Sequence, residues 1–279
     1  MEKLLKIPYK VFNDWDLLQQ FLERRGNPRY ELVGDVNLFW NRDIIDLGNL
    51  VRVDGKLNLD SSSIESLGNL EYVGGHLILH ATPIESLGNL EYVGGILRLS
   101  STPIESLGNL KYVGSELNLE YTSIKCLVNL VRVDGYLDLS ESSIESLGNL
   151  EHVDGSLSLG DTEIKSLGNL VRVSGNLDLS GTSIKSLGNL EYVGGYLDLN
   201  STPIESLGNL VRVDVGAFKL DDTPIESLGN LEYVGGNLIL TNTPIQSLGN
   251  LKYVGDTIYL SRNHQIPEEQ LTKFKIEYD

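Results

Sequence analysis

Cysteine is almost missing from this chain of 279 residues, which contains only Cys126. A single cysteine excludes an intramolecular disulfide and a cysteine-based metal site. Cys126 also falls at a position that serine holds in other copies of the repeat described below, for example Ser106 and Ser146. We therefore interpret it as a replaceable small residue and not as a nucleophile.

Aromatic residues and long apolar runs are also scarce. Aromatic residues make up 7% of the chain against 41% for all hydrophobic residues, which suits a thin interior filled by Leu, Val and Ile. No run approaches the ~20 apolar residues that a membrane helix needs. The first residues, MEKLLKIPYKVF, lack the apolar core and cleavage pattern of a secretory signal. We expect a cytoplasmic protein that does not contact membranes.

Basic residues are outnumbered, with 22 Lys and Arg against 39 Asp and Glu, for a formal net charge of −17. The summed field should repel nucleic acid and anionic lipid surfaces. Direct binding of nucleic acid is therefore not expected, and a protein partner with a basic surface is favoured.

A phrase of twenty residues, LILHATPIESLGNLEYVGGI, runs from Leu77 to Ile96 and recurs with drift along most of the chain. The spacing is twenty throughout except between Leu207 and Leu228, where the segment VDVGAFKL adds one residue and Phe218 replaces a leucine. We expect a local bulge there. Self-similarity at a fixed period indicates a solenoid. The LGNL segment or its variant begins at Leu47, Leu67, Leu87, Leu107, Leu127, Leu147, Leu167, Leu187, Leu207, Leu228 and Leu248.

Within one turn, Leu77 and Leu79 alternate with His76, Ile78 and His80. This two-residue period predicts a short strand with one face inward. One turn cannot bury its apolar side chains alone, so the turns should stack at ~4.8 Å into a rod of roughly 50 Å before the caps. The remaining apolar positions of this turn are Ile84, Leu87, Leu90 and Val93.

The pattern GGxLxLxxTPIxxLGNLxxV resembles a leucine-rich repeat of the shortest, twenty-residue kind, with Leu77, Leu79 and Ile84 at the core positions of LxLxxNxL. The receptor L-domain pattern NLxxVxGxLxL is similar too, as are LGNLxxVGG repeats of uncharacterised phage and large-virus proteins. The resemblance covers about residues 33–266. It implies a mainly β fold, a right-handed parallel β-solenoid or leucine-rich-repeat-like rod, and it does not imply a function.

The chain departs from that family after the strand, where Thr82 and its counterparts stand in place of the usual Asn. A ladder of hydroxyl groups is one way to satisfy the backbone groups of the turns. The asparagine of the LGNL segment, such as Asn89, is the alternative.

Both ends differ from the repeat and are predicted to be α-helical caps. Residues 1–32 form a helical N-terminal cap whose helix begins after Asn13 or Asp14. Residues 33–266 form the solenoid of about eleven turns, and residues 267–279 form a C-terminal capping helix. Because caps cover the end layers, we expect a monomer that does not polymerise end to end.

The outward positions of the predicted strands vary from turn to turn, while other exposed positions change less. A varied face on a repeated scaffold is typical of a recognition surface, although neutral drift at solvent-facing positions is the alternative. Tyr136, Tyr196 and Tyr259 are the expected anchors. The predicted partner-binding face comprises His76, Ile78, His80, Arg98, Glu116, Tyr136, Asp138, Asp178, Tyr196, Asp198, Lys219 and Tyr259.

A second outward ladder alternates tyrosine with basic residues. Stacking at one-turn spacing would let the rings pack and the guanidinium groups lie over them. We favour a structural role for this ladder over a ligand groove. Its members are Arg52, Tyr72, Tyr92, Tyr112, Arg132, His152, Arg172, Tyr192, Arg212, Tyr233 and Tyr253.

Catalytic patterns are weak. Asp178 and Asp198 should be neighbours on adjacent turns, close enough to share a cation or to act as the carboxylates of a glycosidase, but no positioned acid or substrate cleft accompanies them. His76 and His80 lack a third metal ligand, and no phosphate-binding loop occurs. We predict no enzyme activity, no cofactor and no metal.

The leading hypothesis is a non-enzymatic protein-protein interaction module that uses its variable strand face. The first alternative is an acidic decoy that inhibits a nucleic-acid-binding or host-defence protein, in which case the chain could be virus-encoded. The second alternative is a carbohydrate- or cation-binding β-solenoid centred on Asp178 and Asp198.

Overall fold

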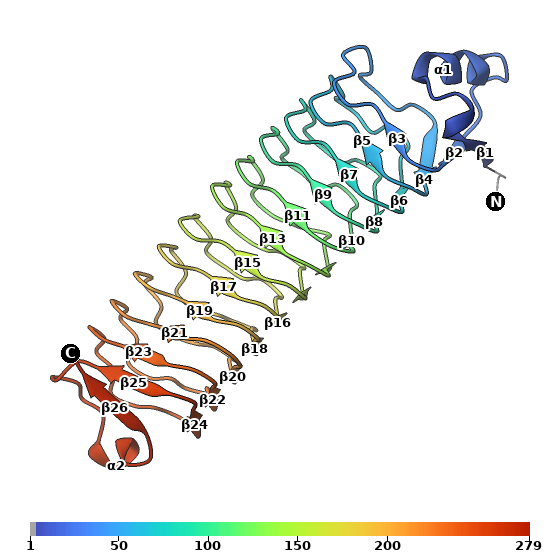
Figure 1. The fold of residues 1–279 in the computed structure, drawn as a ribbon. Helices are drawn as coiled ribbons and strands as arrows, with labels where there is room; N and C mark the ends of the chain where they lie inside the picture. Colours follow the sequence, from blue (N-terminus) through green and yellow to red (C-terminus); the bar gives the residue numbers. More distant parts are fainter. Residues whose placement is uncertain (1–3) are drawn as a thin grey trace.

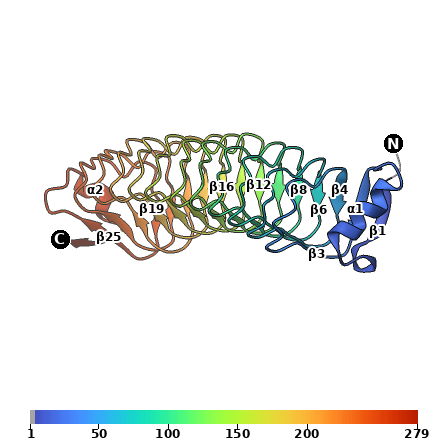
Figure 2. The same cartoon turned by 90° about the horizontal axis from the view of Figure 1, so that it is seen from above.

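The computed structural model describes residues 4–279, which form a parallel β-solenoid of about 12 turns with repeats of about 20 residues. The turns stack into a rod with the two termini at opposite ends (Figure 1). The rod bends only gently along its length (Figure 2). The mainly β, parallel solenoid predicted from the period is therefore confirmed.

Two sheets of 13 strands each run the length of the rod, and successive turns pair in parallel. Sheet A contains, in spatial order, β1 (Leu5–Pro8), β2 (Tyr30–Val33), β4 (Leu50–Val53), β6 (Tyr72–Val73), β8 (Tyr92–Val93), β10 (Tyr112–Val113), β12 (Arg132–Val133), β14 (His152–Val153), β16 (Arg172–Val173), β18 (Tyr192–Val193), β20 (Arg212–Val213), β22 (Tyr233–Val234) and β24 (Tyr253–Val254). Sheet B contains β3 (Val36–Asn37), β5 (Leu57–Asn58), β7 (Leu77–Ile78), β9 (Leu97–Arg98), β11 (Leu117–Asn118), β13 (Leu137–Asp138), β15 (Leu157–Ser158), β17 (Leu177–Asp178), β19 (Leu197–Asp198), β21 (Phe218–Lys219), β23 (Leu238–Leu240), β25 (Thr257–Leu260) and β26 (Lys275–Tyr278).

Each turn has three sides. One side lies in sheet A and the next in sheet B. The third is held by single parallel bridges such as that between Ser86 and Ser106. Leu97 pairs with Leu117 of the next turn, so identical inward side chains stack into columns. These Leu, Ile and Val side chains form one continuous buried core along the rod, and their burial is the main force that holds the turns together.

Hydroxyl groups satisfy backbone carbonyls at the turn after sheet B. The buried Thr162 donates a hydrogen bond of 2.6 Å from Oγ1 to the carbonyl oxygen of Leu159, and the same bond recurs at eight other turns. Asparagine contributes less regularly, for example between Asn69 Nδ2 and Asn49 Oδ1. The hydroxyl ladder is thus the more regular of the two devices. Its donors are Thr82, Thr102, Thr122, Ser142, Thr162, Thr182, Thr202, Thr223 and Thr243.

The extra residue of the longest repeat lies in a corner and not in a strand. The strands on both sides therefore keep their regular pairing, and the predicted bulge is a longer corner between the two sheets. Tyr192 still pairs with Arg212 in sheet A, and Leu197 pairs with Phe218 in sheet B. The added length is absorbed between them, where Val215 is 66% exposed. Phe218 is fully buried in the leucine column, as expected.

The N-terminal end combines strands with one helix. Helix α1 (Trp15–Glu23) begins where Asp14 accepts a hydrogen bond of 2.9 Å from the backbone N–H of Leu17, an N-cap of the expected kind. Trp15, Leu18 and Leu22 turn their side chains into the core. A short 3₁₀ helix, η1 (Tyr9–Val11), precedes α1, while β1 pairs with β2 and extends sheet A.

The C-terminal end is less helical than predicted. Helix α2 (Glu268–Leu271) is a single turn, and the last strand, β26, pairs in parallel with β25 and extends sheet B. The alternation of Lys275, Ile276 and Glu277 suits a strand better than a helix. Helices account for 6% of the chain, so a strand and a short helix together finish each end (Figure 2). Across residues 4–279, no helix has the length and apolar character needed to cross a membrane.

Candidate binding face

The outward ladder of sheet A is a continuous stack at its N-terminal end. The guanidinium carbon of Arg52 lies 3.5 Å from the ring centroid of Tyr72. The ring centroids of Tyr72 and Tyr92 are 4.7 Å apart, and those of Tyr92 and Tyr112 are 4.9 Å apart, with both pairs stacked. Each ring therefore contacts the next turn and adds to the cohesion of the rod.

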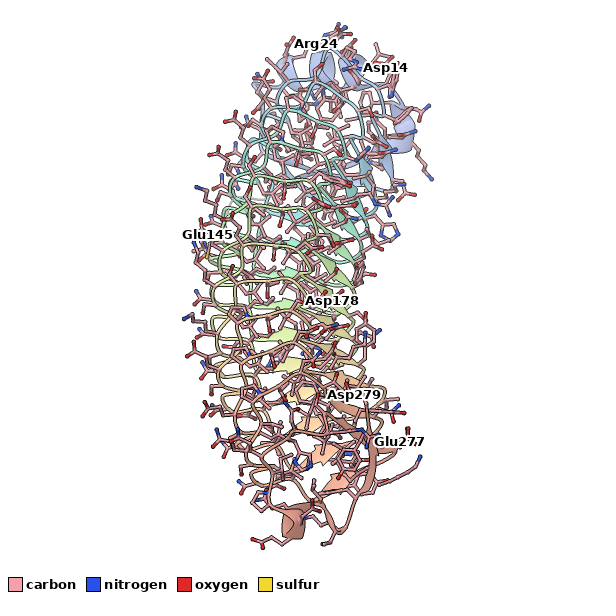
Figure 3. All side chains as sticks on the ribbon, turned by 90° about the vertical axis from the view of Figure 1, so that its left-hand side faces the viewer. Asp14, Arg24, Glu145, Asp178, Glu277 and Asp279 are labelled. Carbon is pink, nitrogen blue, oxygen red and sulfur yellow. The ribbon has the colours of Figure 1, made fainter. Side chains whose placement is uncertain are left out.

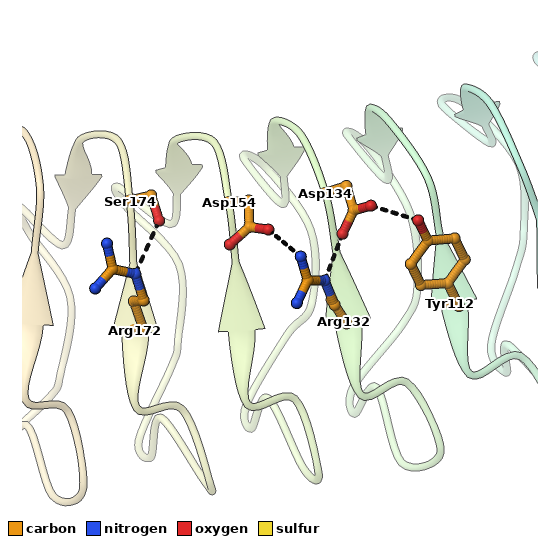
Figure 4. A network of polar contacts seen from close by, with 6 residues as sticks. All are labelled: Tyr112, Arg132, Asp134, Asp154, Arg172 and Ser174. Atoms are coloured by element: carbon orange, nitrogen blue, oxygen red, sulfur yellow. Dashed lines mark hydrogen bonds and ion pairs between the residues drawn. The ribbon is translucent and has the colours of Figure 1, made fainter.

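Ion pairs replace ring stacking in the middle of the ladder (Figure 4). The hydroxyl of Tyr112 donates to Asp134, and Arg132 bridges Asp134 and Asp154. The hydrogen bond to Asp134 is the main reason that the pKa of Tyr112 is raised to about 12. Hydrogen bonds from Arg132 and then Tyr112 hold the pKa of Asp134 below its ordinary value. These groups are already satisfied by one another.

The C-terminal part of the ladder uses both devices. Arg172 lies 3.9 Å from the ring centroid of Tyr192, whose hydroxyl donates a 2.7 Å hydrogen bond to Asp214. Arg212 lies 3.8 Å from the ring of Tyr233, and Tyr233 stacks on the next tyrosine at 4.7 Å. The predicted stacking of rings and guanidinium groups is confirmed towards both ends of the ladder.

Outward polar side chains before the strands of sheet B cap the backbone of the next turn. Nδ1 of His76 accepts a hydrogen bond of 2.9 Å from the backbone N–H of Ile96. The sequence reading missed this structural role, because the bond joins residues one full turn apart. The same contact is made by Asp35 to Lys56, by Ser156 to Asn176, by Asn176 to Tyr196 and by Asn237 to Thr257.

Outward Asn and Asp side chains within the strands of sheet B also support the backbone. Oδ1 of Asp178 accepts hydrogen bonds from the backbone N–H of Ser180 at 3.0 Å and from its hydroxyl at 2.7 Å. A carboxylate that bonds the backbone two residues on fixes the exit of the strand. The equivalent backbone bond is accepted by Asn58, Asn118, Asp138 and Asp198.

A shallow depression of about 320 Å³ lies on the outward face of sheet B near the middle of the rod, where Figure 3 places Asp178. Tyr136 and Tyr196 stand at its two ends and are 38% and 37% exposed. Burial, followed by the charge of Asp138, raises the pKa of Tyr136. Burial, followed by the charges of Asp178 and Asp198, raises the pKa of Tyr196. The depression is lined by Tyr136, Ser156, Leu157, Ser158, Asn176, Asp178 and Tyr196.

Small side chains create the depression. Ser156 and Ser158 occupy a turn between the two tyrosines, and both line the depression. The tyrosines and Asp178 are among the site residues expected from the sequence, whereas the two serines and Asn176 are not. The available signal was a pair of successive turns without an outward tyrosine, those of Ser156 and Asn176, between the turns of Tyr136 and Tyr196.

Asp178 and Asp198 pair in register, as predicted, and Lys219 follows on the next turn. Nζ of Lys219 lies 2.7 Å from Oδ2 of Asp198, whose side chain is only 13% exposed. The hydrogen bond to Asp198 is the main cause of the raised pKa of Lys219. The adjacent carboxylates therefore differ, because Asp198 is paired with an ammonium group and Asp178 is not.

The other predicted face residues lie outside the depression. Nδ1 of His80 is 2.9 Å from both the carbonyl and the hydroxyl oxygen of Ser100. Arg98 and Glu116 form a loose ion pair at 3.6 Å between adjacent turns. Ile78 also lies towards the N-terminal end, and Tyr259 lies towards the C-terminal end, where it pairs with β23 and β26. The predicted residues thus share one sheet face without forming one site.

Among residues 4–279 there is no cluster of three or more His, Cys, Asp or Glu side chains placed to hold a metal ion. Comparisons with models of protein families, with curated proteins and with solved structures found no match for this chain.

Proposed function

We propose that this protein is a rigid, non-enzymatic rod that binds a partner protein through the outward face of sheet B, centred on the depression between Tyr136 and Tyr196. The depression is the observation that carries the proposal. Tyrosine is among the residues most often found as binding hot spots, and the two rings flank polar groups at a concave position. The proposed partner presents a basic surface, because the rod carries a net charge of −17.

The resemblance to leucine-rich repeats supports this proposal only at the level of architecture, since repeat rods commonly bind along one extended face. A cytoplasmic monomer remains the proposed working state. An acidic decoy for a nucleic-acid-binding or host-defence protein is a special case of the same proposal. It requires a partner that DNA displaces from the rod.

The test is affinity capture by immobilised full-length protein, with identification of bound material by mass spectrometry and measurement of the purified pair. Tyr136→Ala combined with Tyr196→Ala should weaken binding by about a hundredfold, as expected for two anchors of about 1.4 kcal/mol each. The matched control combines Tyr121→Ala with Tyr253→Ala, which removes two exposed tyrosines outside the depression, and should bind normally. Equal affinity of the two double variants would exclude this face.

Salt and competitors separate the alternatives. Affinity for a basic partner should fall as sodium chloride is raised, because the attraction between exposed charges is screened. Competition by duplex DNA for the captured partner would identify the decoy function. Binding of a purified glycan, with loss of that binding in the Tyr136 and Tyr196 variant, would replace the protein partner by a carbohydrate.

A further inference from the structure

Asp178 lines the depression and uses only one of its two carboxylate oxygens in hydrogen bonds. Its Oδ1 is occupied by the backbone N–H and hydroxyl of Ser180. No residue from 4 to 279 donates a hydrogen bond to Oδ2 or forms an ion pair with this carboxylate. This oxygen is therefore free to accept a hydrogen bond from a ligand in the depression.

The neighbouring aspartates are arranged differently. Asp198 is neutralised by Lys219 at 2.7 Å. Oδ1 of Asp138 accepts the backbone N–H and hydroxyl of Ser140, and its charge acts on the adjacent Tyr136. Of the three, Asp178 alone both lines the depression and lacks a cationic or tyrosine partner for its second oxygen. Its negative charge is the one that a bound cation would complement.

The shape of the depression favours a cationic side chain on an extended chain. Tyr136 and Tyr196 are separated by three strand spacings of about 4.8 Å, or about 14 Å, which about four residues of an extended peptide span at ~3.4 Å each. A cation at Asp178 would also lie near the ring of Tyr196 on the next turn, where a cation–π contact adds attraction. A bare divalent ion would find one free carboxylate oxygen, far fewer than the 6–8 oxygens calcium prefers.

We infer that the depression receives an arginine or lysine side chain from an extended segment of the partner, with the cationic group bound to Oδ2 of Asp178 between the two tyrosines. This inference rests on the proposed function and specifies what the partner must present. Specificity comes from the charge and reach of one side chain, and the flanking tyrosines contact the residues on either side of it.

The test uses the full-length protein and a five-residue peptide with arginine at its centre and two valines on each side. The peptide is acetylated at its N-terminus and amidated at its C-terminus. The matched ligand carries citrulline, which keeps the shape of arginine without its charge. Binding is measured by calorimetry, and its position by chemical shifts of backbone amides. The arginine peptide should perturb the turns from Tyr136 to Tyr196 and bind about tenfold more tightly than the citrulline peptide, the effect of one charge-assisted hydrogen bond.

Asp178→Asn is the decisive variant because it keeps Oδ1 for Ser180 and removes only the charge. It should lower the affinity for the arginine peptide about tenfold and leave the affinity for the citrulline peptide unchanged. Asp60→Asn, on the same sheet face far from the depression, is the control and should change neither. Equal binding of both peptides, no effect of Asp178→Asn, or calcium binding that Asp178→Asn abolishes would overturn the inference.

The two proposals fail in different ways. If partner capture depends on Tyr136 and Tyr196 but not on Asp178, the proposed binding face stands. The inference that a cationic side chain binds Asp178 is then wrong. If capture is also indifferent to the two tyrosines, both are wrong. Binding of a glycan but of neither peptide would assign the depression to sugar recognition.

Discussion

Sheet A and sheet B share one core and one period, yet their outward faces satisfy their polar groups differently. On sheet A the side chains mainly bind one another, as in the network of Tyr112, Arg132 and Asp134. On sheet B the polar side chains around the depression mainly bind nearby backbone groups of the rod. Asp178 uses only Oδ1 for this purpose, so its Oδ2 has no hydrogen bond. A ligand at the middle of sheet A would have to break the contacts of Arg132 with Asp134 and Asp154, whereas a ligand in the depression would find the second oxygen of Asp178 without a partner.

The comparison explains why regular spacing alone does not identify a binding face. Stacked tyrosines at 4.7 Å present a uniform aromatic ribbon, whereas Tyr136 and Tyr196 stand apart around small residues. Concavity and an unpaired charge distinguish the second arrangement. The predictions below test whether the two faces are independent.

The largest expected effect comes from the core beneath the depression. Leu177 is fully buried between Leu157 and Leu197, and Leu177→Ala should lower the free energy of unfolding by about 2–5 kcal/mol. Chemical denaturation followed by circular dichroism measures this loss. Because neighbouring turns depend on each other, binding at the depression should weaken as well. Unchanged stability would contradict the shared core.

An intermediate effect is expected from the sheet A ladder. Tyr92 stacks on Tyr72 and Tyr112, so Tyr92→Ala should cost about 1–2 kcal/mol of unfolding free energy, from two ring pairs of about 0.5–1 kcal/mol each. Tyr92→Phe keeps the ring and serves as the control. Partner affinity should be normal in both variants, and a specific loss of binding in Tyr92→Ala would show that sheet A also contacts the partner.

The smallest effect is a pH dependence of the sheet A network. Folding lowers the pKa of Asp134 below its ordinary value of 3.8, so the ionised carboxylate stabilises the folded state above about pH 4, and this contribution disappears as the pH falls through the lowered value. The side chains of Arg132 and Asp134 are 46% and 30% exposed, so solvent screening limits the contribution to about 0.5 kcal/mol. Between about pH 6 and about pH 3, Asp134→Asn should therefore lose less stability than the native chain.

The matched control for this pH dependence is Asp43→Asn, which changes an exposed aspartate of the first loop. It should follow the native curve. If both variants show the same flattening, the acid sensitivity comes from the net charge and not from the network.

The sequence was sufficient to predict the strands of sheet B and the core, because Leu77 and Leu79 repeat with both the strand period and the turn period. It did not predict the strands of sheet A, which are mostly only two residues long. It located the extra residue in the segment that contains Val215 but predicted a bulge, since a repeat length does not say whether a strand or a corner is longer. The C-terminal helix was overestimated because Pro267 and two glutamates give a strong start signal, whereas the alternation after Lys275 is short.

The candidate site was only partly predictable. Comparison of equivalent outward positions in successive turns brought out Tyr136, Tyr196 and Asp178, because these positions vary along the rod. Ser156 and Ser158 were missed, since a small side chain creates space only relative to neighbours whose positions the sequence does not give. The backbone role of His76 was missed for the same reason.

The corner that absorbs the extra residue offers a reporter position for engineering. Val215 is exposed, and the adjoining Gly216 packs beside Tyr196, so that a Cβ there would lie 3.3 Å from the tyrosine Cβ. Replacing Cys126 by the serine found at equivalent positions leaves a cysteine-free chain. A fluorophore attached through Val215→Cys would then sit at the rim of the depression, and its emission would register occupancy in real time.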